Sequence, residues 1–159
     1  MPPASTWKST VAREGEIEVL RVFNTPPVDY SLCNQTVTLY HAVQGDPFSC
    51  SRVLFHGAFL DQKRVKSVDK TGSNEVSSFL LVLPSGWDGR PVWQDRANDG
   101  QVHFSLAPGD KVLLGEGPEI KDRTEWAGFI PAKVPGLVVV RDVDVKYWHG
   151  KVCHIEAGG

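Results

Sequence analysis

The sequence predicts an all-β domain, a small β-barrel with long loops and an N-terminal arm, from three observations. Several short segments alternate apolar with polar residues, which is the pattern of half-buried strands. Turns that contain glycine or proline separate these segments, and no long helical repeat accompanies them. A barrel removes the exposed edges that short strands would otherwise have to protect, so the sequence favours a barrel over a sandwich.

The totals indicate one domain. The 159 residues suffice for a real core, and neither an internal repeat nor a linker divides them. We assign residues 1–14, which are polar and contain prolines, to the N-terminal arm and residues 15–159 to the β-barrel domain. The 17 basic and 19 acidic residues give a formal net charge of −2, which offers no basic face for sequence-independent nucleic-acid binding.

The chain carries no expected membrane or export signal. The first ten residues lack a signal-peptide pattern, and no apolar run approaches the roughly 20 residues that cross a bilayer. Three cysteines without a CxxC spacing do not suggest a disulfide framework, so we expect a reducing compartment and no membrane partner.

Three strands are predicted in the first half of the chain. Glu16–Phe23 alternates isoleucine and valine with glutamate, and Gln35–Val43 alternates valine and leucine with threonine and tyrosine. Between them, Pro26 and its proline neighbour indicate a loop, because proline gives a sheet no donor. Ser49–Leu60 is the third strand, with Gly57 as a bulge or a close approach of backbones.

The middle of the chain is predicted to combine loops with a hairpin. Asp69–Glu75 is a loop by composition, Val76–Leu83 is a strand, and residues 87–100 are irregular. Within Gln101–Gly117, an alternating strand, a Pro-Gly-Asp turn and a second apolar run predict a hairpin around which the remaining strands are organised.

The last part is predicted to hold one short helix and two strands. Glu119–Trp126 is the window that suits a helix, Leu137–Tyr147 is a long alternating strand, and Val152–Glu156 is a final short strand after a turn.

Neither a catalytic residue nor a metal ligand is predicted. There is no G-x-S-x-G elbow, and the cluster His149, Cys153 and His154 lacks the second ligand pair that zinc requires. Asp142 and Asp144 share one face of a strand, but the alternation places that face toward solvent. We therefore expect a protein that is not an enzyme and that holds no cofactor.

The five tryptophans fall in predicted loops, in the arm or at a turn. Aromatic side chains in such places either cap the ends of a barrel or anchor a protein interface, and the sequence leaves both open. The candidate interface residues are Trp7, Trp87, Trp93, Trp126 and Trp148.

The order of several short motifs is distinctive from residue 36 onward. The segments are TVTLYH (36–41), FSCSRVLFHGAFLDQ (48–62), SSFLLVLPSG (77–86), FSLAPGDKVLLGEGPEI (104–120) and VVVRDVDVKYWHGKVCHIEAGG (138–159). This order resembles the small minor-capsid or head–tail connector proteins of tailed bacteriophages. The matching positions are Tyr40, His41, Leu83, Pro84, Phe104, Leu106, Gly109, Asp110, Gly115, Asp142, His154 and Gly158.

The resemblance implies a structural virion protein of the neck, assembled in the host cytoplasm. Such a head-closure (stopper) subunit forms a homo-oligomeric ring, a hexamer or dodecamer, that retains packaged DNA. Its partners would be the portal or adaptor protein on one side and the tail-terminator and tail-tube proteins on the other. Polar segments are candidates for projecting into the channel: residues 87–100, or the loop residues Lys70, Thr71, Gly72, Ser73 and Asn74.

Two alternatives remain open. A capsid decoration protein or a tail terminator would have similar composition. A small β-barrel module that binds a glycan or a peptide would require Trp87, Trp93 and Trp126 to converge on one cleft, whereas a ring subunit would spread them over opposite faces.

Overall fold

The computed structural model of the chain describes residue 26 and residues 28–69, 72–94 and 100–159. The predicted arm (1–14) and the predicted strand Glu16–Phe23 lie outside the described residues. So do Trp7, Lys70 and Thr71. No helix in the described ranges is long and apolar enough to cross a membrane.

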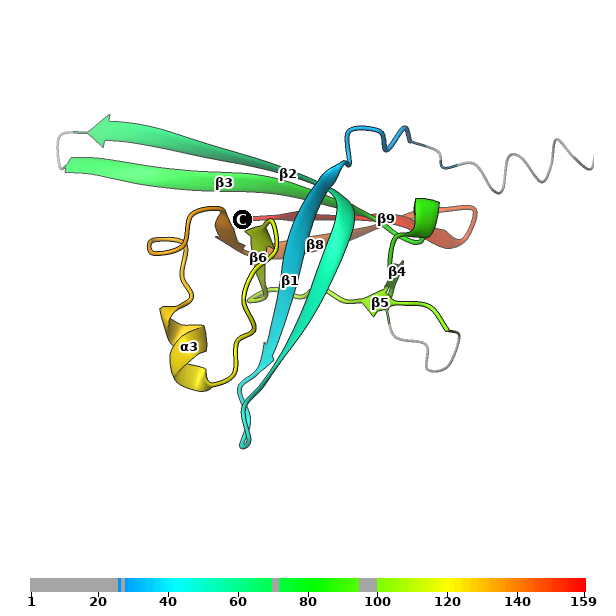
Figure 1. Cartoon of the computed structure of the whole chain (residues 1–159). Helices are drawn as coiled ribbons and strands as arrows, with labels where there is room; N and C mark the ends of the chain where they lie inside the picture. Colours follow the sequence, from blue (N-terminus) through cyan, green and yellow to red (C-terminus); the bar gives the residue numbers. More distant parts are fainter. Residues whose placement is uncertain (1–25, 27, 70–71, 95–99) are drawn as a thin grey trace, which may run out of the picture.

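Seven antiparallel strands form one sheet that curls into a half-barrel (Figure 1), which confirms the all-β prediction. The order across the sheet is β7-β6-β1-β2-β3-β9-β8. The strands are β1 (Gln35–Val43), β2 (Ser49–Asp69), β3 (Gly72–Pro84), β6 (Lys111–Leu114), β7 (Leu137–Val139), β8 (Asp142–Trp148) and β9 (Lys151–Gly158).

Four smaller elements connect the strands. A 3-10 turn, η1 (Trp87–Gly89), precedes the two-residue strands β4 (Val92–Trp93) and β5 (His103–Phe104), which pair with each other in parallel. The helix α3 (Arg123–Gly128) begins at Asp122, whose carboxylate accepts a hydrogen bond from the backbone N–H of Glu125 at 2.7 Å. Asp122 thus acts as the N-cap.

Two bends curl the sheet. Gln35 pairs with Ala58 and Thr36 with His56, so Gly57 is skipped as a bulge, as predicted, at a φ of 90°. Before this bulge β2 pairs with β1, and after it β2 pairs with β3. The second bend is the two-residue link between β7 and β8, which connects the two end strands of the sheet order. Bends of this kind form the corners of barrel-like sheets.

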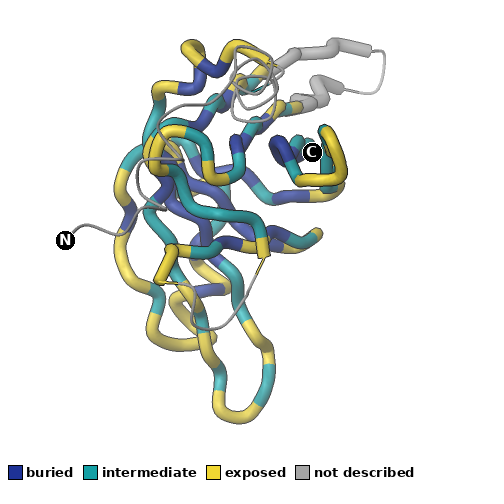
Figure 2. Tube along the Cα trace, turned by 90° about the vertical axis from the view of Figure 1, so that its right-hand side faces the viewer, coloured by how far each residue is buried: buried dark blue, intermediate teal, exposed yellow. Residues whose placement is uncertain are grey.

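Buried apolar side chains fill the interior of the half-barrel. Figure 2 shows buried segments running through the centre of the trace, with exposed turns at the periphery. Phe55 is fully buried, and its ring meets the edge of Phe104 at a centroid distance of 5.1 Å. We call this set the interior cluster: Val37, Leu39, Phe55, Ala58, Leu60, Leu81, Leu83, Phe104, Leu106, Val112, Val138, Val140, Ile155 and Ala157.

A second cluster covers the outer face of β1 and β6. The side chains of Val37 and Leu39 point inward, so the alternating Thr38 and Tyr40 point outward. Tyr40 is nevertheless buried, because α3 and the segment after it fold over it. The outer cluster comprises Tyr40, Leu113, Trp126, Phe129 and Leu137.

A buried lysine joins the outer cluster to the end of α3. The Nζ of Lys111 donates hydrogen bonds to the carbonyl oxygens of Trp126 at 2.8 Å and Phe129 at 2.6 Å. It also lies 4.0 Å from the centroid of the Trp126 ring. The carbonyl of Trp126 also accepts the N–H of Phe129 at 3.2 Å, so the ammonium group adds a second donor to it and donates to the carbonyl that follows the helix. Burial lowers the pKa of Lys111 below its ordinary value.

Three sequence predictions are wrong in detail. The hairpin expected within Gln101–Gly117 does not form, because β5 pairs with β4 while β6 pairs with β1 and β7. Its turn is present, since Asp110 N–H donates to the carbonyl of Ala107 at 3.0 Å. The strand expected over Leu137–Tyr147 is interrupted at residues 140–141. The short helix lies at Arg123–Gly128 rather than Glu119–Trp126.

Candidate assembly surfaces

The outer half of the β2–β3 hairpin extends past the rest of the sheet. Pairing of β2 with β1 ends at Ala58, and pairing of β3 with β9 ends at Leu80. Beyond these points, among the residues that the structure describes, β2 and β3 pair only with each other, up to the pair Asp69–Gly72. We call residues 62–69 and 72–78 the hairpin arm; Figure 1 shows it projecting from the half-barrel.

The loop predicted over Asp69–Glu75 is wrong at the described positions, because Asp69 lies in β2 and residues 72–75 lie in β3. A two-stranded extension has no core to face, so its composition resembles that of a loop. Of the proposed channel residues, Gly72, Ser73 and Asn74 lie in β3 beside the tip of the hairpin arm. Their role in a channel stays a prediction.

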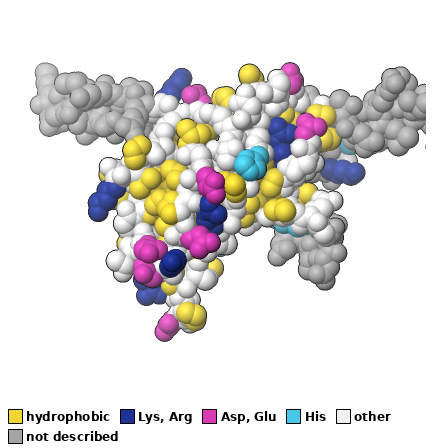
Figure 3. Space-filling model, viewed as in Figure 1, with side chains coloured by type: hydrophobic (Ala, Val, Ile, Leu, Met, Phe, Trp, Pro, Cys, Tyr) yellow, Lys and Arg dark blue, Asp and Glu magenta, His cyan; other side chains and the backbone are white. Residues whose placement is uncertain are grey.

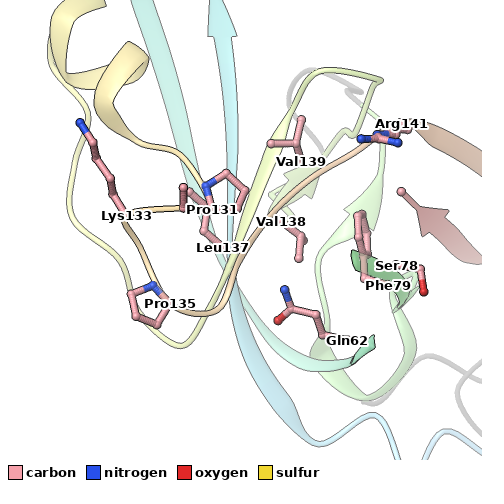
Figure 4. A pocket seen from close by; sticks show the side chains of 12 residues that line it. Gln62, Ser78, Phe79, Pro131, Lys133, Pro135, Leu137, Val138, Val139 and Arg141 are labelled. Atoms are coloured by element: carbon pink, nitrogen blue, oxygen red, sulfur yellow. The ribbon is translucent and has the colours of Figure 1, made fainter. Parts of the chain in front are cut away.

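A groove runs between the root of the hairpin arm and β7. It has a volume of about 590 Å³ and is shown in Figure 4. Phe79 and Gln62 come from the side of the hairpin arm, Leu137 and Val139 from β7, and Lys133 from the loop before it. We call it the β7 groove. Figure 3 shows hydrophobic side chains gathered on the surface below the hairpin arm.

Buried polar side chains hold the segment before β1 against β9. The Tyr30 hydroxyl lies 2.7 Å from Nδ1 of His154 and 3.4 Å from Sγ of Cys153. Nε2 of His154 lies 3.1 Å from a carboxylate oxygen of Glu156. Burial raises the pKa of Tyr30, and the neighbouring Cys153 adds to the shift.

The geometry of these buried polar side chains indicates a structural role. Cys153 Sγ and His154 Nδ1 are 3.2 Å apart, a contact that a cysteine nucleophile and its base would also make. Cys153 is only 4% exposed, however, and neither it nor His154 lines the β7 groove. Among the described residues, no three His, Cys, Asp or Glu side chains are placed to hold a metal ion.

Arg90 fixes the corner at Gly57. Its guanidinium donates to the carbonyls of Gly57 at 2.8 Å, Trp87 at 3.0 Å and Cys33 at 3.0 Å. A Cβ at Gly57 would lie 2.6 Å from the arginine Nε, so the glycine is required for this close approach as well as for its positive φ. Sequence reasoning missed Arg90, because an isolated arginine in an irregular segment carries no pattern.

A histidine–aspartate pair lies beside a second, smaller groove of about 260 Å³. His41 Nδ1 is 2.7 Å from Oδ1 of Asp110, whose other oxygen accepts the N–H of Ala107 at 2.9 Å. Ser51 lines the same groove, but its hydroxyl donates to the backbone carbonyl of His41 at 3.4 Å. The serine is therefore oriented toward the backbone rather than toward the imidazole.

The four tryptophans that the structure describes lie in separate places. Trp87 donates to the carbonyl of Cys153 at 3.0 Å, and Trp93 packs edge-on against Phe104. Trp126 is buried in the outer cluster, and Trp148 lies beside His149 at the end of β8. Neither groove is lined by a tryptophan, so Trp87, Trp93 and Trp126 do not converge on either one. An interface role for them stays a prediction.

The separated sequence motifs meet in pairs across the sheet. His41 bonds Asp110, Pro84 pairs with His154, and Asp142 pairs with Gly158. Gly115 N–H donates to Thr36, and its carbonyl accepts from the Thr38 hydroxyl at 2.7 Å. These motif residues therefore specify which strands adjoin and how their turns close.

Comparison with known proteins gives one family. The chain matches a model described as a family of unknown function (DUF6751) over residues 32–159. No curated protein and no solved structure matches. The matched range includes every strand of the half-barrel, the hairpin arm and the β7 groove. The chain therefore belongs to the DUF6751 family of unknown function.

Proposed function

We propose that this protein is a ring-forming structural subunit of the head–tail junction of a tailed bacteriophage. In this role it sits between portal and tail, retains packaged DNA and presents a surface to the tail. The hairpin arm is the observation that carries the proposal: two strands continue past the sheet over residues 62–69 and 72–78, and within the described part of the chain they pair there only with each other. A hairpin of this kind suits insertion into a ring lumen or between neighbouring subunits.

The order of sequence motifs supports the same proposal. They resemble head–tail connector proteins, and their residues pair across the half-barrel, so the motif order corresponds to a fold rather than to scattered surface positions. A glycan-binding module is less well supported, because tryptophan lines neither groove. A decoration protein or tail terminator remains the alternative within the structural class.

Shortening the hairpin arm tests the proposal. Residues 66–75 are replaced by Asn-Gly, a two-residue turn that joins Val65 to Val76. Val65 and Val76 are cross-strand partners with the same hydrogen-bonding arrangement as Asp69 and Gly72, which flank the present turn. The half-barrel keeps all its other strand pairs. We expect rings to form on portal-bearing heads while packaged DNA becomes sensitive to added nuclease.

The matched control is Gly45→Ala in the β1–β2 turn, where an added Cβ makes only ordinary contacts at 3.8 and 3.9 Å. Heads completed with this control should retain their DNA. Heads that also stay full with the shortened hairpin arm would contradict a channel role, and failure of either protein to bind heads would contradict the junction assignment.

A further inference from the structure

We infer that two copies of this protein join through their β8 strands, which pair antiparallel about a two-fold axis at Val145. The inference goes beyond the proposed function, because it concerns the free protein in solution. Such a contact is isologous and closes at two copies, whereas a ring requires heterologous contacts between different surfaces.

The first support is a row of backbone groups that point away from the sheet. Among the residues that the structure describes, β8 pairs only with β9. The N–H of Ser85 donates to the carbonyl of Cys153, and the N–H of Phe79 donates to the carbonyl of Gly159. The odd-numbered residues of β9 from 153 onward therefore direct their backbone groups at β3, and the even-numbered residues direct theirs at β8.

The even-numbered residues of β8 face β9 in return, since Asp144 is opposite Glu156 and Lys146 is opposite His154. The odd-numbered residues of β8 direct their N–H and carbonyl groups to the other side, where no described strand pairs with β8. These residues are Val143, Val145 and Tyr147. A free edge of this kind accepts another strand by β-augmentation.

The ends of this free edge place its centre at Val145. On one side the neighbouring positions are taken, because Val140 donates its N–H to Asp110 and accepts the N–H of Gly109. On the other side β8 ends at Trp148. Antiparallel pairing with Val145 opposite its own counterpart therefore overlaps the whole free edge of both copies.

The second support is charge complementarity in the same register. With Val145 at the axis, Asp144 of each copy lies opposite Lys146 of the other copy, and the side chains are 62% and 42% exposed. Both lie on the outer face, because Val143 and Val145 pack against the interior cluster. Cross-strand pairs of opposite charge stabilise a sheet. Within one chain Lys146 already contacts Asp144, so the four side chains would form a square of alternating charges.

The charges also disfavour the other registers. Sliding one strand by two residues in one direction places Asp144 opposite Asp144 of the other copy. Sliding it in the other direction places Lys146 opposite Lys146, and an in-register parallel pair brings both like-charged pairs together. Like charges directly opposite destabilise a sheet. The register that the ends of the edge select is therefore the one that the charges select.

The third support is an exposed aromatic side chain at this edge. Tyr147 is 68% exposed. In the inferred register it lies opposite Val143 of the other copy, on the same face of the combined sheet. Cross-strand pairs of an aromatic with a β-branched residue are among those that stabilise sheets. Pairing would thus cover both ends of the free edge with apolar contacts.

A charge exchange between two copies of the full chain tests the inference. Asp144→Lys leaves only lysines at the facing positions, and Lys146→Asp leaves only aspartates. Each variant alone should raise the dimer dissociation constant about tenfold or more, because two attractive pairs become repulsive. An equimolar mixture should regain a dimer of nearly wild-type affinity, because every facing pair is again of opposite charge. Sedimentation velocity of the wild type, each variant and the mixture measures this.

The matched control is Asp61→Lys, which makes the same change of charge at an exposed position of β2, separated from β8 by β3 and β9. It should dimerise like the wild type. Recovery of the dimer on mixing also shows that both charge variants are folded. A wild type that stays monomeric at high protein concentration would overturn the inference, and so would charge variants that each dimerise alone as well as the wild type.

Amide hydrogen exchange supplies an independent readout. In the dimer the N–H groups of Val143, Val145 and Tyr147 become hydrogen-bonded, so their exchange should slow as the concentration of wild-type protein rises. In Asp144→Lys their exchange should stay fast at the same concentrations. The N–H of Ile155 faces β3 and should be protected equally in both proteins. Equal exchange of the three edge amides in the two proteins would contradict the assigned edge.

The inference and the proposed function can fail separately. Dimer formation is measured on the purified protein alone, whereas retention of DNA is measured on heads that carry the shortened hairpin arm. A wild-type dimer together with full heads would keep the inference and remove the channel role. A monomeric wild type together with nuclease-sensitive heads would do the reverse.

Discussion

The two hydrophobic clusters of this protein lie on opposite faces of the same strands and are stabilised differently. The interior cluster consists of apolar side chains, and the strands of the curled sheet surround it. The outer cluster is covered by one short helix and its flanking segments, and it includes contacts to the ammonium group of Lys111. The comparison teaches that a small sheet can bury both faces of β1 when a short helix covers the outer face and a buried ammonium group donates to carbonyls at the end of that helix.

The largest expected difference between the clusters concerns loss of an aromatic ring. Phe55→Ala removes a fully buried ring from the interior cluster, and we expect a loss of about 3–5 kcal/mol in the free energy of unfolding. Phe129→Ala makes the same deletion in the outer cluster, where Phe129 is 6% exposed. Its loss should be smaller, because the covering segment can relax into the space. Denaturant unfolding measures both, and an equal or larger loss for Phe129→Ala would contradict the contrast.

An intermediate effect on stability is expected at Gly117, where the outer cluster leaves no room for an added side chain. A Cβ at Gly117 would lie 2.1 Å from the Tyr40 hydroxyl and 2.6 Å from Leu113. Gly117→Ala should therefore destabilise the protein by about 1–3 kcal/mol through overpacking. Gly128→Ala is the matched control, since a Cβ added there, at the end of α3, would meet nothing within 4 Å. The midpoint of thermal unfolding should be lower for Gly117→Ala than for Gly128→Ala. Equal midpoints would contradict the overpacking, because they would mean that the segment around Gly117 shifts to accept the added Cβ.

The smallest effect is a pH dependence confined to the outer cluster. Burial lowers the pKa of Lys111 in the folded protein. As the pH rises toward the pKa of an unfolded lysine, the folded protein therefore loses this proton before the unfolded chain does, and the unfolded chain binds more protons at this site than the folded protein. Stability attributable to Lys111 should therefore rise as the pH approaches 10.5, the ordinary pKa of a lysine. The difference in unfolding free energy between the wild type and Lys111→Met isolates this change, because Tyr30 and Tyr40 titrate in both proteins. A difference that falls or stays flat with increasing pH would contradict the assigned burial.

Local sequence patterns predicted the bounds of individual strands better than they predicted which strands pair with each other. The bounds of β1 agree with the prediction because both alternating faces of Gln35–Val43 are informative, and Gly57 marks the bulge. Alternation indicates which face is buried but not which strand lies alongside, so the pairing of β6 with β1 was missed. The hairpin arm was missed because a hairpin beyond the core needs no apolar face.

The candidate surfaces were less predictable than the fold. The β7 groove combines Phe79, Leu137 and Gly159, which lie far apart in the sequence and meet only after the sheet curls. Arg90 and Lys111 carry charges that a sequence pattern assigns to solvent, yet each donates its hydrogen bonds to backbone carbonyls. Such placements depend on tertiary contacts that no local period encodes.

The order of strands has a consequence for folding kinetics. The meander β1-β2-β3 is built from neighbours in sequence, whereas β6 reaches β1 and β9 reaches β3 across long loops; the Thr38–Gly115 bond alone spans 77 residues. Loop-closure entropy delays such distant pairings, so we expect folding on the millisecond-to-second scale typical of high contact order. During that interval the meander would expose a free edge on each side, and intermolecular pairing at those edges is the aggregation route that refolding at high concentration should favour.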